Sequence, residues 1–91
     1  MYYPAILIED AIMGGVIVIL PDMPGLVTTG DTMDIALDNV QDAVEHYLRD
    51  AETAPHPSDL DEVKQNEAFQ KYNGVPALVH VDLGFLEERK R

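Results

Sequence analysis

The chain contains no cysteine. That absence excludes a disulfide scaffold, a thiolate zinc site, an iron–sulfur cluster and a cysteine nucleophile. Long apolar runs are also missing, since no run approaches the roughly 18 residues that are needed to span a bilayer. The first residues, Met1–Pro4, lack the basic start of a secretory signal. The sequence therefore predicts a cytoplasmic protein.

Basic residues are scarce. The 91 residues include 6 Lys and Arg against 17 Asp and Glu, which gives a formal net charge of −11. Half of the basic residues are the last three of the chain, so residues 1–88 carry a formal charge of −14, from three bases and 17 acids. A surface with this charge repels phosphate backbones and attracts basic proteins. The charge therefore argues against direct contact with nucleic acid. It is consistent with a basic protein partner and equally with a surface whose charge serves solubility alone.

A composition of 46% hydrophobic and 25% charged residues over this length is typical of one globular domain. Runs rich in β-branched and aromatic residues predict four strands, and Gly14-Gly15 predicts a hairpin turn between the first two. The predicted strands are Tyr2–Glu9, Val16–Leu20, Leu26–Thr29 and Val75–Leu83.

Apolar residues recur at three- and four-residue steps from Met33 to Ala51, which predicts an amphipathic helix. Thr32 or Asp31 can serve as its N-cap. A second, acidic stripe lies on the far side of this helix and consists of Asp34, Asp38, Asp42 and Glu45. The helix dipole favours acids only in the first turn, so it does not account for the last two.

The element order β-β-β-α-(α)-β predicts an α+β fold, with a single sheet and helices on one face. The second helix is the weaker one, with Ser58 as its expected N-cap and Gly74 near its expected end. The second strand is apolar at every position, a pattern that favours burial of both of its faces. Because the helices of so small a chain can cover only one face, we expect another chain on the other face. The sequence thus predicts a homo-oligomer, a dimer or higher.

Carboxylates are the only abundant catalytic side chains. Those at strand ends are Glu9, Asp10, Asp22 and Asp82, and two of them could bind a divalent metal for phosphoryl chemistry. No spacing in the sequence requires such a site. The three histidines lack metal-ligand spacing, and no Ser or Thr is placed as a nucleophile. We therefore predict a non-enzymatic protein without catalytic, cofactor or metal residues, and keep a relict metal-dependent nuclease as a third hypothesis.

Ile35 is an apolar residue on the outward side of the predicted long helix, between Asp34 and Asp38. Single exposed apolar residues are common and need no explanation. On a domain that is expected to have a partner, however, this side chain could be a small apolar anchor inside an acidic rim.

Six segments of the chain form a combination that is more specific than any one of them. They are Met1–Ile6, Gly14-Gly15, the turn Pro21–Gly25, the helix entry Thr29–Thr32, the connector with Pro55, Pro57 and Ser58–Leu60, and the closing Val81–Leu83. This combination, over about residues 1–83, resembles the HicB-like antitoxin family.

The resemblance implies a small α+β domain at residues 1–83, related to a reduced RNase H-like fold, followed by a C-terminal tail at residues 84–91. Family members typically neutralise HicA, a small basic mRNA-cleaving toxin, by occluding its RNA-facing surface. For this chain the resemblance implies an antitoxin that binds a basic HicA-type toxin. The candidate partner-binding residues are Asp34, Ile35, Asp38, Asp42 and Glu45.

The sequence departs from the family pattern in two ways. Family antitoxins commonly carry a C-terminal DNA-binding domain, and this sequence stops at Arg91, so we expect a short form without it. The position of Ile35 is usually acidic in the family and would complete a capping box with Thr32. A function of another class stays open, namely an orphan homo-oligomeric α+β module that could bind a small ligand and has no toxin partner.

Overall fold

The structure is a computed structural model, which describes residues 1–10, 12, 14–71 and 74–89. Its strands are β1 (Tyr2–Glu9), β2 (Val16–Ile19), β3 (Val27–Gly30) and β4 (Val75–His80). Its helices are α1 (Met33–Tyr47), α2 (Leu60–Val63), α3 (Glu67–Lys71) and α4 (Gly84–Arg89). Among the described residues, none of these helices is both long enough and apolar enough to cross a membrane.

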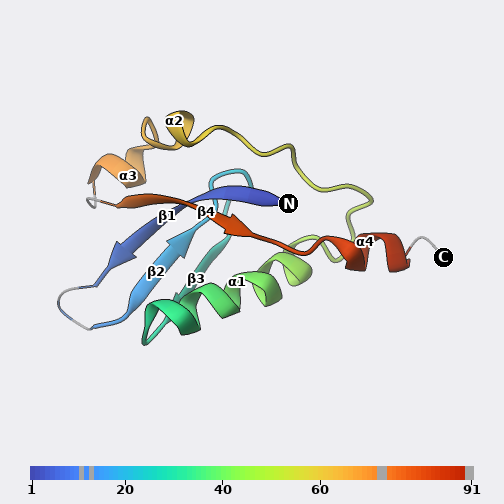
Figure 1. Ribbon diagram of the computed structural model, residues 1–91, viewed down its shortest axis with the longest axis horizontal. Helices are drawn as coiled ribbons and strands as arrows, with labels where there is room; N and C mark the ends of the chain where they lie inside the picture. Colours follow the sequence, from blue (N-terminus) through green and yellow to red (C-terminus); the bar gives the residue numbers. More distant parts are fainter. Residues whose placement is uncertain (11, 13, 72–73, 90–91) are drawn as a thin grey trace.

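The strands form one antiparallel sheet in the order β3-β2-β1-β4 (Figure 1). β1 lies in the middle, where Ile6 faces Ile19 of β2 and Tyr3 faces Val79 of β4. The β1–β2 connection uses two glycines with positive φ, as the predicted hairpin turn requires. The single sheet and the α+β class are confirmed, whereas the RNase H-like relationship stays a prediction. β3 and β4 are the two edge strands.

One face of the sheet is covered by α1, which packs on β3 and β2. Ala36, Val40 and Val44 follow one another at four-residue steps, so they share the side of the helix that points to the sheet, and all three are buried. They join a core cluster with inward-facing strand residues, among them Tyr3, Ala5, Val16, Val18 and Val79. Tyr3, Ala5 and Val18 are fully buried.

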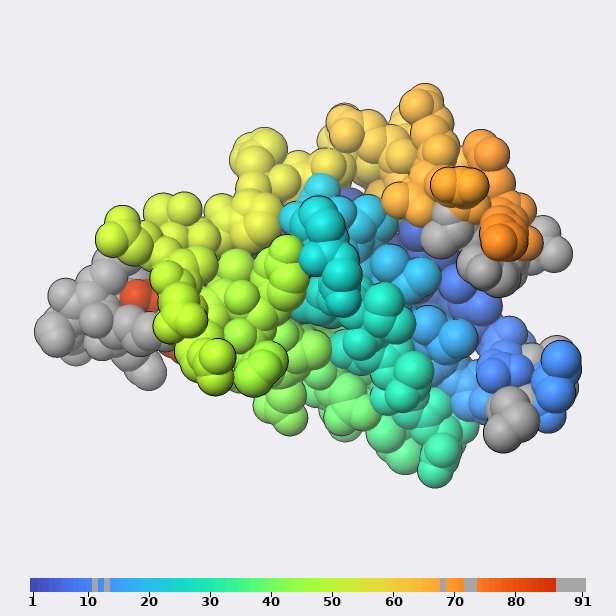
Figure 2. Space-filling view, turned by 180° about the vertical axis from the view of Figure 1, so that it is seen from behind, coloured from blue at the N-terminus to red at the C-terminus, as the bar shows by residue number. Residues whose placement is uncertain are grey.

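The opposite face carries α2 and α3, so the expectation that all helices lie on one face is wrong. Val63 of α2 packs on Ile6 and Ile8, and Ile17, Ile19 and Phe69 pack around this second cluster. Seen from behind, β2 and β3 lie between α1 and the α2–α3 segment (Figure 2). The two-sided apolar pattern of β2 is thus satisfied within the chain, which removes the reason for which we expected a second chain over that face.

The first helix ends one turn before its predicted end at Ala51. Leu48 is the C-cap, and it is also the last fully apolar side chain of the stripe that is buried. Beyond it the backbone hydrogen bonds join residues three apart instead of four. The Arg49 N–H, for example, donates to the His46 carbonyl at 3.3 Å. Ala51 and Ala54 still pack against the α1-side core, so the chain continues along this core after the helix has ended.

The predicted second helix is two short helices, and Ser58 does not cap it. Ser58 instead donates its N–H and its hydroxyl to the carboxylate of Asp22, at 2.8 and 2.5 Å. Asp59 becomes the N-cap of α2, although its side chain accepts no capping hydrogen bond. The Tyr3 hydroxyl holds the same connector by donating to the Pro55 carbonyl at 2.6 Å. The long connector is thus fixed to the sheet at two points.

The last predicted strand shows the expected alternation, with Val79 and Val81 buried and Leu78 and His80 exposed. α4 lies in the segment that was predicted to be a tail, and Leu86 of this helix is buried in the core on the α1 side. The sequence pattern predicts no helix or strand there. The domain boundary at residue 83 stays a prediction.

Candidate partner-binding surface

The outer side of α1 is the candidate surface, and the start of the helix fixes its orientation. Thr32 has an extended backbone, and its hydroxyl accepts a hydrogen bond from the Ile35 N–H at 3.3 Å. Of the two predicted candidates, Thr32 and Asp31, Thr32 is therefore the N-cap. Further along, Asn39 donates its side-chain amide to the Thr29 carbonyl at 2.9 Å and so ties the helix to the β3 edge.

Four carboxylates occupy the exposed side of α1. They are Asp34, Asp38, Asp42 and Glu45. Asp34, Asp38 and Asp42 follow one another at successive four-residue steps, which places them on one line along the helix. Glu45 accepts a hydrogen bond from the Gln41 amide at 3.3 Å. None of the four forms an ion pair with a described residue, because the ion pairs there join Arg49 to Asp50 and Lys64 to Asp61.

Ile35 lies beside these carboxylates and leaves 46% of its surface exposed. It is the third residue of the helix, where a Glu or Gln side chain would bond back to the N–H of the N-cap. Isoleucine cannot do this, so the capping box of α1 is half complete. The structure thus brings all five candidate residues to one exposed side of a single helix.

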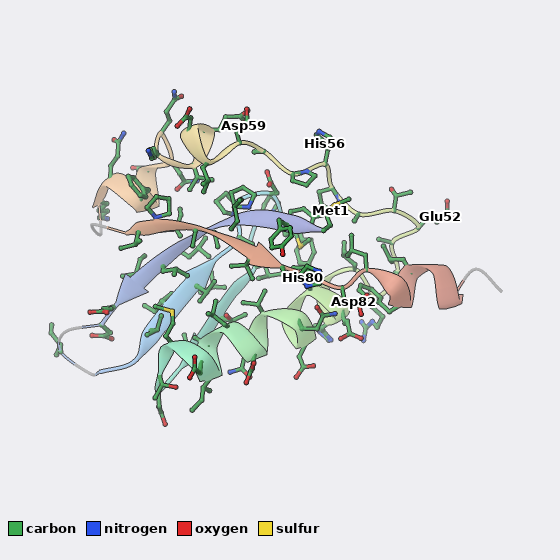
Figure 3. All side chains as sticks on the ribbon, viewed as in Figure 1. Met1, Glu52, His56, Asp59, His80 and Asp82 are labelled. Carbon is green, nitrogen blue, oxygen red and sulfur yellow. The ribbon has the colours of Figure 1, made fainter. Side chains whose placement is uncertain are left out.

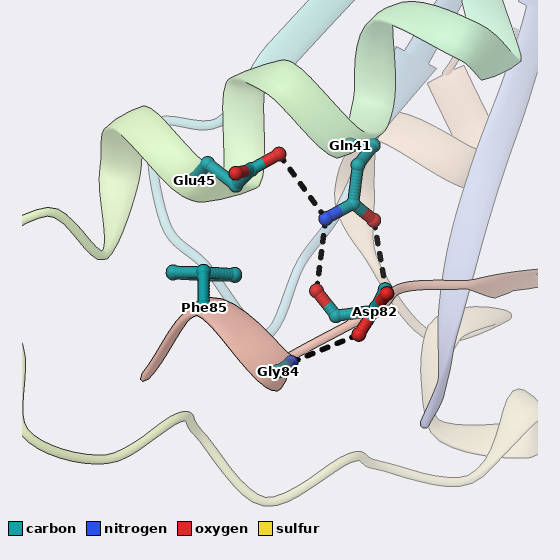
Figure 4. A pocket seen from close by; sticks show the side chains of 5 residues that line it. All are labelled: Gln41, Glu45, Asp82, Gly84 and Phe85. Carbon is teal, nitrogen blue, oxygen red and sulfur yellow. Dashed lines mark hydrogen bonds between the residues drawn. The ribbon is translucent and has the colours of Figure 1, made fainter. Parts of the chain in front are cut away.

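A hollow of about 370 Å³ lies where α1 meets the end of β4 and the start of α4 (Figure 4). Gln41 spans it by donating to the Asp82 carbonyl at 2.8 Å and by accepting from the Asp82 N–H at 2.9 Å. The Asp82 carboxylate in turn accepts from the Gly84 N–H at 2.9 Å. Because these polar groups bond to one another, they hold α1, the end of β4 and the start of α4 together. The hollow therefore gives no support to small-ligand binding.

The carboxylates at strand ends do not gather into a metal site within the described ranges, where no group of three or more metal-binding side chains is found. Asp22 holds Ser58, and Asp82 holds the first residue of α4. His80 stacks edge-on against the Tyr2 ring, with 5.1 Å between the ring centroids. His80 and Asp82 lie at the end of β4, whereas His56 lies along the connector above the sheet (Figure 3).

Among the ionisable groups of the described residues, Tyr3 is the one whose pKa its surroundings change most clearly. Burial raises the pKa of its hydroxyl above the ordinary value of 10.0, and the negative charge of Asp22 raises it further. Both effects favour the neutral form, which is the form that donates to Pro55. Tyr3 therefore serves the fold rather than the candidate surface.

Sequence reasoning missed the role of Gln41. The sequence gives little indication of this role, because a glutamine on the flank of an amphipathic helix is ordinary. Its two partners are the backbone N–H and carbonyl of Asp82, which lies 41 residues further along the chain. It also missed the open backbone edge of β4, because the order of strands in a sheet is not written in local patterns. A Pro at position 76 was the available hint of an edge strand.

Comparison with known proteins gives a family. A family model described as "HicB_like antitoxin of bacterial toxin-antitoxin system" matches residues 3–91. No curated protein matches the chain.

Solved structures give the same fold. The antitoxin HicB of Burkholderia pseudomallei is 28% identical, with a TM-score of 0.72 over 92% of this chain, which spans 65% of that protein's chain. Its N-terminal domain alone is 27% identical, with a TM-score of 0.69, and is matched over 100% of its length by 91% of this chain. A toxin–antitoxin complex from Streptococcus pneumoniae shares the fold at 20% identity, with a TM-score of 0.70 over 98% of this chain and 71% of that one. The chain belongs to the HicB-like antitoxin family of bacterial toxin–antitoxin systems.

Proposed function

We propose that this chain is a non-enzymatic, cytoplasmic antitoxin that binds a small basic HicA-type toxin and occludes the surface with which the toxin holds mRNA. The observation that carries the proposal is the acidic side of α1, whose four carboxylates are exposed and form no ion pair with the described residues. Family membership supports the antitoxin role. A structure of a HicA3 and HicB3 toxin–antitoxin complex, with 23% identity and a TM-score of 0.67 over 90% of this chain, shows that the fold occurs in such complexes.

The spacing of the carboxylates is unfavourable for the isolated helix. Like charges at four-residue steps destabilise a helix by about 0.2–0.5 kcal/mol per pair. Asp34–Asp38 and Asp38–Asp42 are two such pairs, and no cation of the described residues relieves them. A basic partner would relieve this repulsion when it binds, so the arrangement makes sense for a contact surface.

The proposed mechanism is competition for cations. A toxin that binds mRNA needs Lys and Arg to hold phosphates. The α1 carboxylates would engage the same cations, and the body of the chain would exclude the RNA by its bulk. The net charge of −11 also steers a basic protein towards this chain and keeps nucleic acid away from it. Binding by this mechanism weakens as salt is added.

The test is co-expression of this chain with the product of any short basic reading frame that lies beside its gene. We expect the two proteins to copurify and growth to be rescued from the toxin. The double variant Asp38→Lys, Asp42→Lys should weaken binding by about tenfold or more and flatten its dependence on salt. Binding is measured by titration calorimetry at low and high salt.

The matched control is Glu62→Lys, Glu67→Lys, which changes the net charge equally on exposed residues of α2 and α3. It should lower affinity much less, because those acids lie on the other face of the sheet. An equal loss in both variants would assign the effect to net charge and remove α1 from the contact. Failure of the wild-type chain to copurify with the toxin or to rescue growth would overturn the antitoxin proposal.

A further inference from the structure

The outer edge of β4 is an open stretch of backbone. Met1 and Val81 exchange both of their backbone hydrogen bonds, at 3.0 and 2.8 Å. In an antiparallel ladder such pairs alternate with pairs whose backbone groups point away. With Tyr3 opposite Val79, the residues of β4 that turn their N–H and carbonyl groups outward are therefore the even-numbered ones, from Pro76 to His80.

The open stretch has two defined ends. Pro76 lacks an N–H, so it supplies only a carbonyl. At the other end the backbone N–H and carbonyl of Asp82 are both taken by the side chain of Gln41. Between them lie Leu78 and His80, whose outward N–H and carbonyl groups have no partner among the hydrogen bonds of the described residues. The other edge differs, since Asn39 already bonds to the Thr29 carbonyl of β3.

We propose that this edge pairs with the same edge of a second copy, so that two antiparallel β4 strands join two sheets into one. In the register that sets Leu78 opposite His80 of the second copy, every outward N–H and carbonyl of both residues finds a partner. Shifting the register so that Leu78 faces Leu78 sets Pro76 opposite His80, and the His80 carbonyl then loses its donor. The two ends of the stretch therefore select one self-complementary pairing, with a twofold axis at Val79.

The side chains next to the edge favour a second copy as the occupant. Val75–Val81 contains no Asp, Glu, Lys or Arg, although the whole chain has a net charge of −11. Leu78 and Tyr2 lie on the face opposite α1 and expose 54% and 59% of their surfaces. The acidic helix α1 packs on β3 and β2, away from this edge, so two copies can meet along the uncharged strip without bringing their α1 helices together. The pairing would place Leu78 of one copy against the stacked His80 and Tyr2 of the other.

An edge with so little protection is unusual. Natural sheets normally protect their edge strands with charged side chains, proline, bulges or a covering element. β4 has one proline, at position 76, and no charged side chain, so nothing of this kind protects Leu78 and His80. This inference is independent of the toxin proposal, because it uses a different strand and needs no toxin.

The first experiment measures self-association of the full chain by sedimentation velocity over a range of concentrations. We expect a dimer for the wild type. Leu78→Pro removes an N–H that points outward and leaves the β1–β4 bonds intact, and it should raise the dimer dissociation constant by about tenfold or more. Leu78→Lys should do the same by adding a charge. The matched control is Ile12→Lys, which adds the same charge at a residue of the β1–β2 hairpin that is 92% exposed.

The second experiment tests the register. Because the chain has no cysteine, single cysteines can be added without background. Val79→Cys should form a disulfide between two copies under mild oxidation, since the two residues would face each other at the axis as a close, non-hydrogen-bonded pair. Ala77→Cys, on the same face two residues away, should not.

Three results would overturn the inference. They are a monomeric wild type, a Leu78→Lys variant that dimerises as well as Ile12→Lys, and a cross-link that forms at position 77 rather than 79. Loss of toxin binding in Leu78→Pro without a change in self-association would assign the edge to the toxin instead. A circular dichroism spectrum equal to that of the wild type shows that each variant is folded.

Discussion

The side-chain amide of Gln41 forms a closed pair of hydrogen bonds with the backbone of Asp82. Its Nε2 donates to the Asp82 carbonyl at 2.8 Å, and its Oε1 accepts from the Asp82 N–H at 2.9 Å. The amide therefore makes the two hydrogen bonds that a backbone residue of an adjacent strand would make with Asp82. It fastens the middle of α1 to the point where β4 ends and α4 begins (Figure 4).

Gln41→Ala should lower the free energy of unfolding by about 1–2 kcal/mol, because it removes the two hydrogen bonds to the Asp82 backbone and the one to Glu45. Gln41→Glu tests the amide itself, since it keeps the length of the side chain but loses the donor and sets a carboxylate against the Asp82 carbonyl. It should destabilise at least as much as alanine. Urea unfolding followed by circular dichroism measures both. A glutamate variant as stable as the wild type would contradict the role of the amide.

Much of the fold could be predicted because local chemistry specifies it. The two glycines of the hairpin, the Thr32 cap and the stripe of Ala36, Val40 and Val44 all act within a few residues of the chain. The side of the sheet on which the later helices lie could not be predicted in the same way. It depends on the packing of Val63 against Ile6, which are distant in sequence, and on the bond that draws Ser58 to Asp22.

The close approach of α1 to β3 leaves no room for a side chain at Gly30. A Cβ there would lie 2.8 Å from the Ala36 Cα and 2.9 Å from the Ile35 carbonyl carbon, and both are backbone atoms that cannot rotate away. Gly30→Ala should therefore lower the free energy of unfolding by about 2–3 kcal/mol, as overpacking does. The measurement is thermal or urea unfolding.

Gly25→Ala is the control for that substitution. Gly25 has a φ of 87°, and a Cβ there meets no atom within 4 Å. Its replacement should lower the stability by about 1 kcal/mol through backbone strain alone. If Gly30→Ala were no more destabilising than Gly25→Ala, the contact between helix and strand would be looser than the structure shows.

The raised pKa of Tyr3 makes stability depend on alkaline pH. The folded chain keeps the Tyr3 proton to a higher pH than the unfolded chain does, because burial and then the Asp22 charge disfavour the phenolate. Its contribution to the free energy of unfolding is therefore fully present below pH 10.0 and is lost as the pH rises through the folded-state pKa. Urea unfolding between about pH 8 and about pH 11 should show this fall.

Tyr3→Phe tests the assignment. It should lower the stability at neutral pH by about 1 kcal/mol, because the bond to the Pro55 carbonyl is lost. The alkaline fall should also be smaller than in the wild type. Tyr2→Phe, at an exposed ring on the same strand, is the control and should keep the alkaline fall. An unchanged alkaline fall in Tyr3→Phe would assign it to another group.

The candidate surface could be predicted to a useful extent because it lies on one helix. A helical period of 3.6 residues is enough to place Asp34, Asp38 and Asp42 on one side and Val40 on the other. The β4 edge could not be found in this way. Its openness follows from strand order and from the bond between Gln41 and Asp82, and both are properties of the whole fold.

Ile35 offers a prediction in which stability and binding change in opposite directions. Ile35→Gln can complete the capping box with Thr32 without adding charge, so the free energy of unfolding should rise by about 0.5 kcal/mol. The same change removes the apolar side chain from the acidic surface, so affinity for the HicA-type toxin should fall by about tenfold, as for other buried anchors. Ile35→Ala should lower the affinity similarly without the gain in stability. Because a fold defect would lower both quantities together, a more stable chain that binds less well would identify Ile35 as part of the contact, and an unchanged affinity would show that it is an ordinary exposed residue.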